Sequence, residues 1–395
     1  MKKLALLDLR CKDKNDKMKR WQKLVILGLL LAIFLSAGLL FYRQGRGYYA
    51  GDLEAHIKSA LSDAPAYSIT KPLYKIVYYC FGGVFGVALV VSLFVIGSIW
   101  ATKRLLDYYF ESKNEFKTWL LAIALNFNIA IYIPWITRCF NSGLQEPNEW
   151  HNSTYIIMKF FALFAMLLYF KIAKTYLKHI ETSQYIIFTI LLLLCNLIKP
   201  SFIIALAPTM LVFFIIDFAK NIKDKRAIAN IVIFGISVLI SLVVLVYQSR
   251  ILYSESSGGG SSIAISFMQA LKASHPYPII SIIQSAAFPL FILCTNMKTV
   301  LGDRKYSTAY LMGIISLVIY LLFIETGPRA RDGNFDWSYS FALMMMFIAA
   351  VSIVRALPKR KTDSRYLVAC YVLFGLHLIS GLIYYCGMLT GMPYN

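Results

Sequence analysis

The chain has 395 residues, of which 58% are hydrophobic and only 15% are charged. Ordinary soluble domains carry roughly 25% charged residues, so this composition excludes a soluble globular protein and indicates an all-α polytopic membrane protein. The net charge of +20 is explained by basic connections between membrane spans and by attraction to anionic lipid headgroups. We therefore expect membrane lipids as partners and no nucleic acid.

Long apolar runs recur along the whole chain, separated by short charged clusters. A helix that crosses about 30 Å of hydrocarbon needs about 20 mainly apolar residues. By this criterion the sequence predicts about eleven transmembrane helices. They cover residues 24–42, 76–101, 118–134, 154–172, 184–198, 201–218, 228–247, 277–297, 306–324, 338–354 and 366–389.

The orientation depends on Lys199-Pro200, which interrupts the fifth and sixth runs and marks either a kink or a hairpin. With a hairpin, Lys and Arg concentrate in alternating connections, as the positive-inside rule requires. The N-terminus is then cytoplasmic and the C-terminus outside, in a multi-pass protein of a bacterial plasma membrane. Residues 1–23 form a basic cytoplasmic tail, and residues 24–395 form a single transmembrane domain with outer loops 43–75, 135–153, 249–276 and 325–337.

The first outer loop contains Asp52, Glu54 and His56. If residues 52–61 are helical, Asp52 and His56 share a face because they are four residues apart, whereas Glu54 faces Lys58. Asp52 is then the candidate general base, His56 its partner, and Glu54 is better suited to a salt bridge. The alternative is that these residues form the solvated face of an amphipathic helix.

Two cationic side chains near the outer rim are candidates to bind an anion. Lys159 lies about two turns inside the fourth span, behind His151 at its mouth. A charged residue inside a span is costly and often marks a site, which favours an ammonium that meets a lipid phosphate; the alternative is that Lys159 extends outward to the interface. Lys199 lies at the turn between the fifth and sixth spans.

The connection from Glu325 to Trp337 holds Arg329, Arg331 and Asp332 among turn-forming Gly and Pro residues. Arg binds phosphate or carboxylate through its planar fork, and Trp or Phe beside it offers a face for a sugar ring. The sequence thus predicts a folded cap with a phosphate-binding role. Internal pairing between Arg and carboxylate side chains remains the alternative.

Four strings carry a resemblance that spans most of the chain: Asp52-Leu53-Glu54-Ala55-His56, Trp150-His151-Asn152-Ser153-Thr154, Lys199-Pro200-Ser201-Phe202 and Asp332-Gly333-Asn334-Phe335-Asp336-Trp337. With the outer acidic residue after the first span and the rim cations, they resemble the GT-C superfamily of membrane glycosyltransferases, in particular bacterial surface-polysaccharide proteins. The family uses polyprenyl-phosphate-linked sugars.

The resemblance implies an inverting enzyme that moves a sugar from a lipid-linked donor to a cell-surface glycan or lipid-linked acceptor on the outer face. Asp52 would be the base, helped by His56, with Glu54 as a weaker candidate. The implied substrate ligands are Lys159, Lys199, Arg329, Arg331, His151 and Asp332. Some relatives use a divalent metal such as Mg or Mn, for which Asp52, Glu54, His56 and His151 are the candidate ligands.

Residues 254–262 are rich in Ser and Gly and are flexible by composition, followed by an apolar stretch at 263–273 that predicts a short interfacial helix. The outer loop 254–276 is therefore a candidate lid over the donor, or a plain linker. Two other functions stay open: a polysaccharide polymerase or ligase of another membrane fold, and a transporter or flippase of lipid-linked glycans. A transporter would carry more polar groups deep in its spans.

Overall fold

The computed structural model describes residues 18–63, 66, 68–110, 114–137, 145–252, 262–274, 277–327, 334–358 and 362–392. This part of the chain is mostly helical. Nine of its helices are long and apolar enough to cross a membrane, so the chain is a polytopic membrane protein. These helices are α1 (Arg20–Gly45), α4 (Val84–Tyr109), α7 (Ser153–Thr175), α9 (Ser201–Lys220), α10 (Lys225–Leu252), α12 (Pro278–Thr295), α14 (Arg304–Leu322), α15 (Asp336–Ala356) and α16 (Ser364–Leu389).

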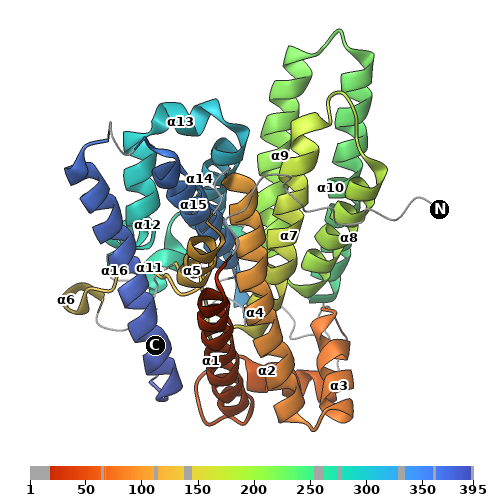
Figure 1. The fold of residues 1–395 in the computed structure, drawn as a ribbon. Helices are drawn as coiled ribbons and strands as arrows, with labels where there is room; N and C mark the ends of the chain where they lie inside the picture. Colours follow the sequence, from red (N-terminus) through yellow and green to blue (C-terminus); the bar gives the residue numbers. More distant parts are fainter. Residues whose placement is uncertain are drawn as a thin grey trace.

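Shorter elements connect or flank the long helices (Figure 1). The helices are α2 (Leu53–Leu61), α3 (Thr70–Cys80), α5 (Glu115–Leu125), α6 (Pro134–Thr137), α8 (Thr182–Ile198), α11 (Gln269–Ser274) and α13 (Met297–Gly302). Strands β1 (Ile263–Ile265) and β2 (Phe323–Glu325) pair antiparallel, with Ile263 opposite Glu325. The expected interfacial helix over 263–273 therefore begins as a strand, because the free edge of β2 supplies backbone partners for residues 263–265.

Helix α15 forms the centre of the bundle. In the apolar stretch of 18 residues that could cross a membrane, 94% of the residues of α15 are buried. The same figure is 28% in α1 and 22% in α16. Apolar side chains on the outer helices, such as Leu31 of α1 and Ile379 of α16, are exposed. An apolar surface of this extent on a protein suits contact with lipid chains rather than water.

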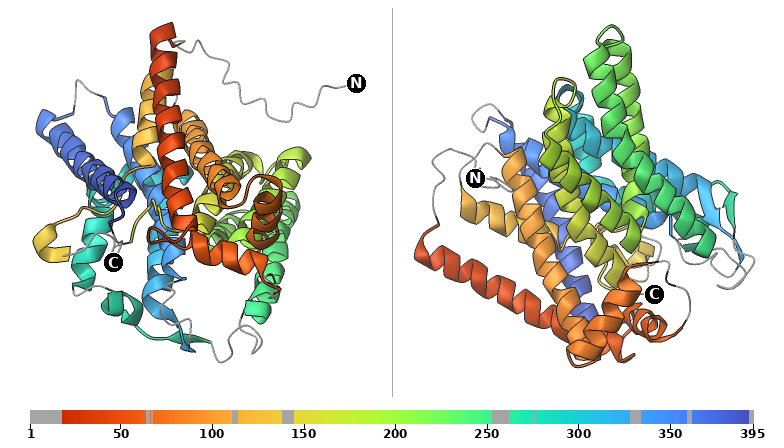
Figure 2. Two further views of the ribbon diagram at one scale, coloured as in Figure 1. Left: turned by 90° about the horizontal axis from the view of Figure 1, so that it is seen from below. Right: turned by 90° about the vertical axis from the view of Figure 1, so that its right-hand side faces the viewer.

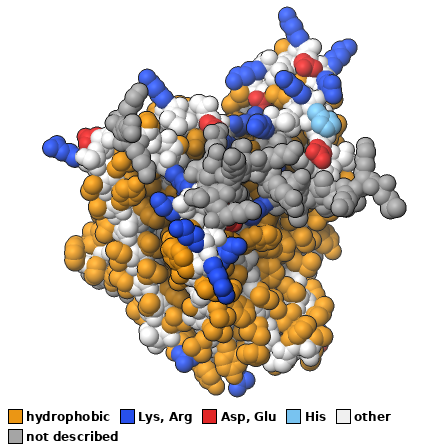
Figure 3. Space-filling model, in the orientation of Figure 1, with side chains coloured by type: hydrophobic (Ala, Val, Ile, Leu, Met, Phe, Trp, Pro, Cys, Tyr) orange, Lys and Arg blue, Asp and Glu red, His pale blue; other side chains and the backbone are white. Residues whose placement is uncertain are grey.

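The two ends of the bundle differ in their short elements and in their charge. Helices α2 and α3 lie at the lower end in Figure 1, and the connections from α7 to α8 and from α9 to α10 lie at the upper end. The view from the right-hand side shows the same separation (Figure 2, right). Lys and Arg side chains gather at the upper end, above a broad hydrophobic belt (Figure 3).

The break predicted at Lys199-Pro200 is confirmed. Helix α8 ends at Ile198 and α9 begins at Ser201, with Lys199 in an extended conformation at φ −156° and ψ 120°. A residue before proline avoids helical torsion angles, which ends α8 here. The chain turns back at this point, so the turn carries Lys199 to the lower end of the bundle (Figure 1).

The predicted span 76–101 is divided in the structure. Residues 70–80 form the separate helix α3, and the long helix α4 begins only at Val84. Gly82 and Gly83 between them have φ values of +81° and +72°, which glycine adopts without steric cost. Because these torsion angles interrupt the helix, α3 is free to lie beside α2 at the lower end.

The predicted span 118–134 is not a continuous helix. Helix α5 ends at Leu125, and the chain from residue 126 to residue 133 is irregular although largely buried. Its backbone groups find partners on other helices: Ile129 N–H donates to the carbonyl oxygen of His377 at 3.3 Å, and Ile131 N–H donates to that of Gln284 at 2.9 Å. Irregular backbone inside a membrane protein is tolerated where protein groups satisfy it in this way.

Candidate functional site

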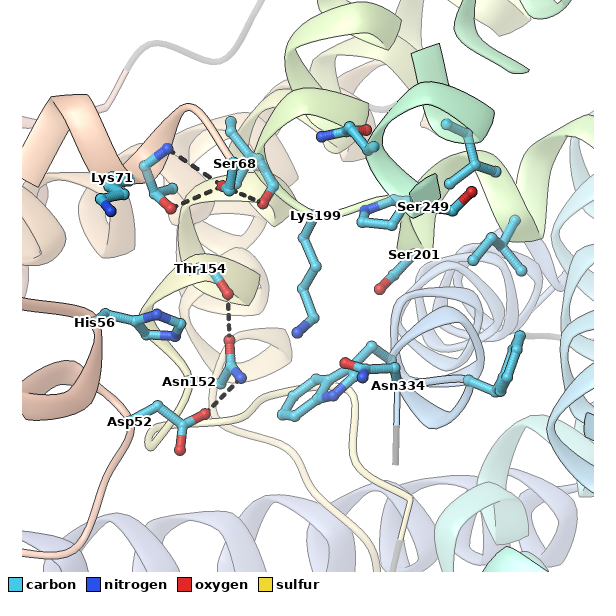
Figure 4. Close-up of a pocket in the computed structure, with 18 of the residues that line it drawn as sticks. Asp52, His56, Ser68, Lys71, Asn152, Thr154, Lys199, Ser201, Ser249 and Asn334 are labelled. Atoms are coloured by element: carbon cyan, nitrogen blue, oxygen red, sulfur yellow. Dashed lines mark hydrogen bonds between the residues drawn. The ribbon is translucent and has the colours of Figure 1, made fainter. Parts of the chain in front are cut away.

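A cavity of about 780 Å³ lies at the end of the bundle that holds α2 and α3 (Figure 1), and Figure 4 shows residues that line it. Its wall is assembled from α2, α3, the start of α7, the α8–α9 turn, the end of α10, both strands and the start of α15. The polar and charged residues that line it are Asp52, His56, Ser59, Ser68, Thr70, Lys71, Tyr74, His151, Asn152, Thr154, Lys199, Ser201, Gln248, Ser249, Glu325 and Asn334.

Asp52 lies at the start of α2, on the edge of the cavity. Its backbone N–H donates to the carbonyl oxygen of His151 at 2.9 Å, and its Oδ2 accepts a hydrogen bond from Asn152 Nδ2 at 2.8 Å. Its side chain makes no capping hydrogen bond to α2. The carboxylate is therefore oriented by the segment that leads into α7 rather than by its own helix (Figure 4).

The predicted helix over residues 52–61 is confirmed as α2, with Asp52 as its N-cap. Asp52 and His56 both line the cavity, as expected for residues four apart on one face. Glu54 does not line it and instead pairs with Lys58 at 2.7 Å. The predicted salt bridge of Glu54 is therefore confirmed, and that carboxylate lies away from the cavity.

Asn152 is a site residue that sequence reasoning missed. Its Oδ1 accepts hydrogen bonds from Tyr155 N–H and Thr154 Oγ1, both at 2.8 Å, while its Nδ2 binds Asp52. Asn at the residue before an apolar helix is a recognised N-cap signal, and this signal was present in the sequence. One amide side chain thus starts α7 and positions the carboxylate of Asp52.

Lys199 extends from the α8–α9 turn into the cavity, on the side facing His56 and Asn152 (Figure 4). Its Nζ lies 4.4 Å from the ring centroid of Trp337, a cation–π contact. The positive charge of Lys199 also lowers the pKa of two imidazoles, those of His56 and His151. The predicted placement of Lys199 with Asp52 at one site is therefore found in the fold.

Both imidazoles of the cavity are held neutral. Burial, and secondly the positive charge of Lys199, lowers the pKa of His56 to about 4 and that of His151 to about 4. His151 also places Nδ1 3.2 Å from Oε2 of the buried Glu149. At neutral pH each imidazole can therefore donate one hydrogen bond and accept another.

Lys159 is not part of the cavity wall. The residue is 5% exposed, and its Nζ donates to Oδ1 of Asn148 at 2.8 Å. The amide of Asn148 in turn donates from Nδ2 to the carbonyl oxygen of Leu125 at 2.8 Å. The ammonium therefore neither extends to the interface nor meets this cavity, because interior acceptors hold it.

Other predicted residues lie outside the part of the chain that the structure describes. They are Arg329, Arg331 and Asp332, together with residues 254–261 and 275–276 of the candidate lid. The residues that flank these segments do reach the cavity: Ile263 follows the lid, and Glu325 and Asn334 bracket the Arg-rich cap. Both segments therefore leave and re-enter the described structure near the cavity wall.

The cavity wall has both polar and apolar parts. Asp52, His56 and Lys71 come from the α2–α3 side. The ends of α8, α9, α10 and β1 contribute apolar side chains next to polar ones such as Lys199 and Gln248. The apolar residues are Ile198, Ile204, Leu245, Val246 and Ile263. Such a wall suits a ligand with a charged or polar head and an apolar chain.

The four candidate metal ligands do not converge. Asp52, His56 and His151 line the cavity, but Glu54 is turned toward Lys58. Across the described ranges no group of three or more His, Cys, Asp or Glu residues is arranged to hold a metal ion. Glu54 therefore does not join the other three candidate ligands at one site, and the use of a divalent metal stays a prediction.

In comparisons with known proteins, no family model and no curated protein matches this chain.

Proposed function

We propose that this chain is a membrane glycosyltransferase, of the GT-C type with its N-terminus inside and C-terminus outside. It moves a sugar from a polyprenyl-phosphate donor to a hydroxyl group of a glycan or lipid-linked acceptor. One observation carries the proposal: an oriented carboxylate, Asp52, and an ammonium, Lys199, line the same cavity, which also has an apolar wall. Acid–base catalysis and a departing phosphate need groups of these two kinds.

In the proposed reaction Asp52 takes the proton of the acceptor hydroxyl as its oxygen attacks the anomeric carbon of the donor. The bond between that carbon and the phosphate oxygen breaks, and the phosphate leaves with the bonding electron pair. The ammonium of Lys199 stabilises the negative charge that develops on the phosphate. Attack opposite the leaving group inverts the configuration at the anomeric carbon.

The two neutral imidazoles suit the recognition of a sugar. A neutral His donates one hydrogen bond and accepts another, which matches hydroxyl groups better than two donors would. His56 is on the Asp52 face of α2, and His151 follows Trp150 at the mouth of α7. We assign both to sugar or acceptor contacts, with His56 also supporting the base.

The apolar wall suits the lipid chain of the donor. Leu245 and Val246 of α10 belong to a helix with many exposed apolar residues, among them Leu239 and Val243. The clustering of Lys and Arg at the opposite end of the bundle (Figure 3) supports an extracytoplasmic position for the cavity. A lipid-linked donor in the outer leaflet then reaches the cavity from the side of α10.

The decisive experiment compares wild type with Asp52→Asn and Glu54→Gln, each incubated with a panel of single-sugar polyprenyl phosphates and acceptor glycans. Asp52→Asn should lose transfer but keep donor binding, because the amide still accepts the hydrogen bond of Asn152 while it no longer takes a proton. Glu54→Gln is the matched control on the same helix and should retain transfer. Full activity of Asp52→Asn would refute the assignment of the base.

A second candidate, proton-coupled transport of a lipid-linked glycan, is favoured by a different observation. The interrupted chain after α5 and the buried Lys159 and Glu146 place polar groups deep in the bundle, as transporters often do. Reconstituted vesicles separate the candidates. A transporter moves labelled glycolipid between leaflets without forming a new glycosidic bond, and the enzyme forms the bond without requiring such movement.

A further inference from the structure

A group of carboxyl side chains lies outside the cavity wall, and Glu149 of this group contacts the wall residue His151. Glu146 and Glu149 belong to the segment before α7, and Asp336 is the first residue of α15. Glu146 is 0% exposed and Glu149 is 5% exposed. None of the three lines the cavity.

Of the three carboxyl groups, Glu146 has the fewest hydrogen bonds to offset the cost of its burial. Neither of its carboxyl oxygens has a hydrogen-bond partner among the described residues, and the same is true of Oδ1 of Asp336. Burying an ionised carboxylate without a partner costs several kcal/mol. A protonated carboxyl group removes the charge and with it most of that cost.

In the part of the chain that the structure describes, the charges that act on Glu146 are negative. Glu149 and Asp336 act on Glu146 as like charges, and the cation nearby is Lys159 of α7, which interacts with Glu149 and donates to Asn148. The other titratable groups that face these carboxylates are the hydroxyls of Tyr155, Tyr320 and Tyr339, from α7, α14 and α15. Among the described residues, two like charges therefore act on Glu146, and the ammonium of Lys159 interacts with Glu149.

We propose that Glu146 and Asp336 form a buried proton-binding site outside the cavity wall and that Glu146 holds a proton at neutral pH. The inference rests on burial and missing partners and does not require the proposed glycosyl transfer. Burial, followed by the neighbouring charges of Glu149 and Asp336, raises the pKa of Glu146 well above its ordinary value.

His151 connects this site with the cavity. Its ring lies in the cavity wall and places Nδ1 3.2 Å from Oε2 of Glu149. A neutral imidazole that takes a proton at one ring nitrogen releases the proton of the other nitrogen to a carboxylate, so charge and protons balance. The contact between His151 and Glu149 therefore links the cavity wall to this group of carboxyl side chains.

The first test is infrared spectroscopy of the purified protein at neutral pH. A protonated carboxylic acid has a carbonyl-stretch band distinct from those of carboxylates. Wild type should show this band, Glu146→Gln should lose intensity in it, and Glu54→Gln, at an ion-paired residue of α2, should leave it unchanged. If Glu146→Gln folds poorly, Glu146→Asp should keep the band at a shifted frequency. A band unaffected by both substitutions would overturn the proposal.

The second test is the melting temperature as a function of pH. The raised pKa of Glu146 means that its protonation favours the folded state, so stability is lost as pH rises through the pKa of the folded protein. As pH rises above the ordinary pKa of 4.5, wild type should lose melting temperature through Glu146, and Glu146→Gln should lose less. A sodium-specific rise in melting temperature, absent with choline and absent in Glu146→Gln, would identify a metal cation as the ligand and overturn the proton.

Discussion

Asn152 Nδ2 donates a hydrogen bond to Asp52 Oδ2 at 2.8 Å and joins two residues that are 100 positions apart in the chain. The same amide begins α7 by accepting from Tyr155 N–H. The side chain of Asp52 makes no capping hydrogen bond to α2, and the contact with Asn152 helps to orient its carboxylate. The position of the proposed base is thereby tied to the start of a transmembrane helix.

Substitution of Asn152 should separate its two roles. Asn152→Ala removes both the N-cap and the donor to Asp52, and loss of an N-cap costs about 1 kcal/mol. Asn152→Ser restores a capping oxygen but has no second donor for Asp52. We expect a lower melting temperature and lower transfer in Asn152→Ala, but a nearly normal melting temperature and still low transfer in Asn152→Ser. Full transfer by Asn152→Ser would show that the contact with Asp52 has no functional role.

Lys199→Gln should slow the chemical step of the proposed transfer. The ammonium lies in the cavity near both imidazoles, and loss of one preorganised group that stabilises transition-state charge typically costs about 100-fold to 1000-fold in kcat. Lys58→Gln is the matched control, because Lys58 is exposed and pairs with Glu54 on the same short helix as Asp52.

The effect of Lys199→Gln on kcat should exceed its effect on KM, since developing phosphate charge is greatest in the transition state. A second readout does not depend on activity. Lys199 is one cause of the lowered pKa of His56, so in Lys199→Gln that pKa should move upward from about 4, as measured by NMR titration. An unchanged kcat would remove Lys199 from the proposed reaction.

Acid should destabilise the fold through His56 and His151. Each has a pKa of about 4 in the folded protein and an ordinary value of 6.5. As pH falls from 6.5 toward 4, the unfolded chain binds protons that the folded chain does not, so stability falls. The loss is on the order of 1 to 3 kcal/mol for each histidine.

His56→Gln should retain more of its melting temperature between pH 6.5 and 4.5 than wild type does. His179→Gln is the control, at a connection on the opposite end of the bundle. Glu146 acts with the opposite sign in part of this pH range, so the informative quantity is the difference between variant and wild type. Parallel pH profiles for wild type and His56→Gln would contradict the buried neutral imidazole.

Local sequence patterns predicted the parts of the structure that depend on neighbouring residues. The face shared by Asp52 and His56 follows from helical spacing, the salt bridge of Glu54 from the same geometry, and the break at Lys199 from the proline that follows it. Positive-inside bias correctly favoured a hairpin there. These signals act over a few residues, so they can be read without knowing the fold.

Other features depend on contacts between distant segments and were missed. The sequence around Lys159 gives the depth of this residue in α7 but not the segment that its side chain faces. In the structure its ammonium donates a hydrogen bond to Asn148. The run 118–134 is apolar enough to span, yet it leaves the helix after Leu125 because α12 and α16 provide partners for its backbone. Such partners are invisible in a local window.

Gly381 of α16 is required by this interrupted segment. A Cβ atom at position 381 would lie 1.6 Å from the carbonyl oxygen of Phe127, whereas one at Gly375 of the same helix would meet nothing within 4 Å. Gly381→Ala must therefore push the irregular chain away, and overpacking of this kind typically costs about 1 to 3 kcal/mol.

Gly375→Ala is the matched control and should be neutral or stabilising by up to about 1 kcal/mol, because alanine favours a helix over glycine. Thermal unfolding in one detergent measures both variants. The hydrogen bonds that Ile129 makes to His377 and Ile131 makes to Gln284 should also weaken in Gly381→Ala, seen as faster amide hydrogen exchange over residues 126–133. Equal melting temperatures for the two variants would mean that α16 does not pack against this segment as closely as described.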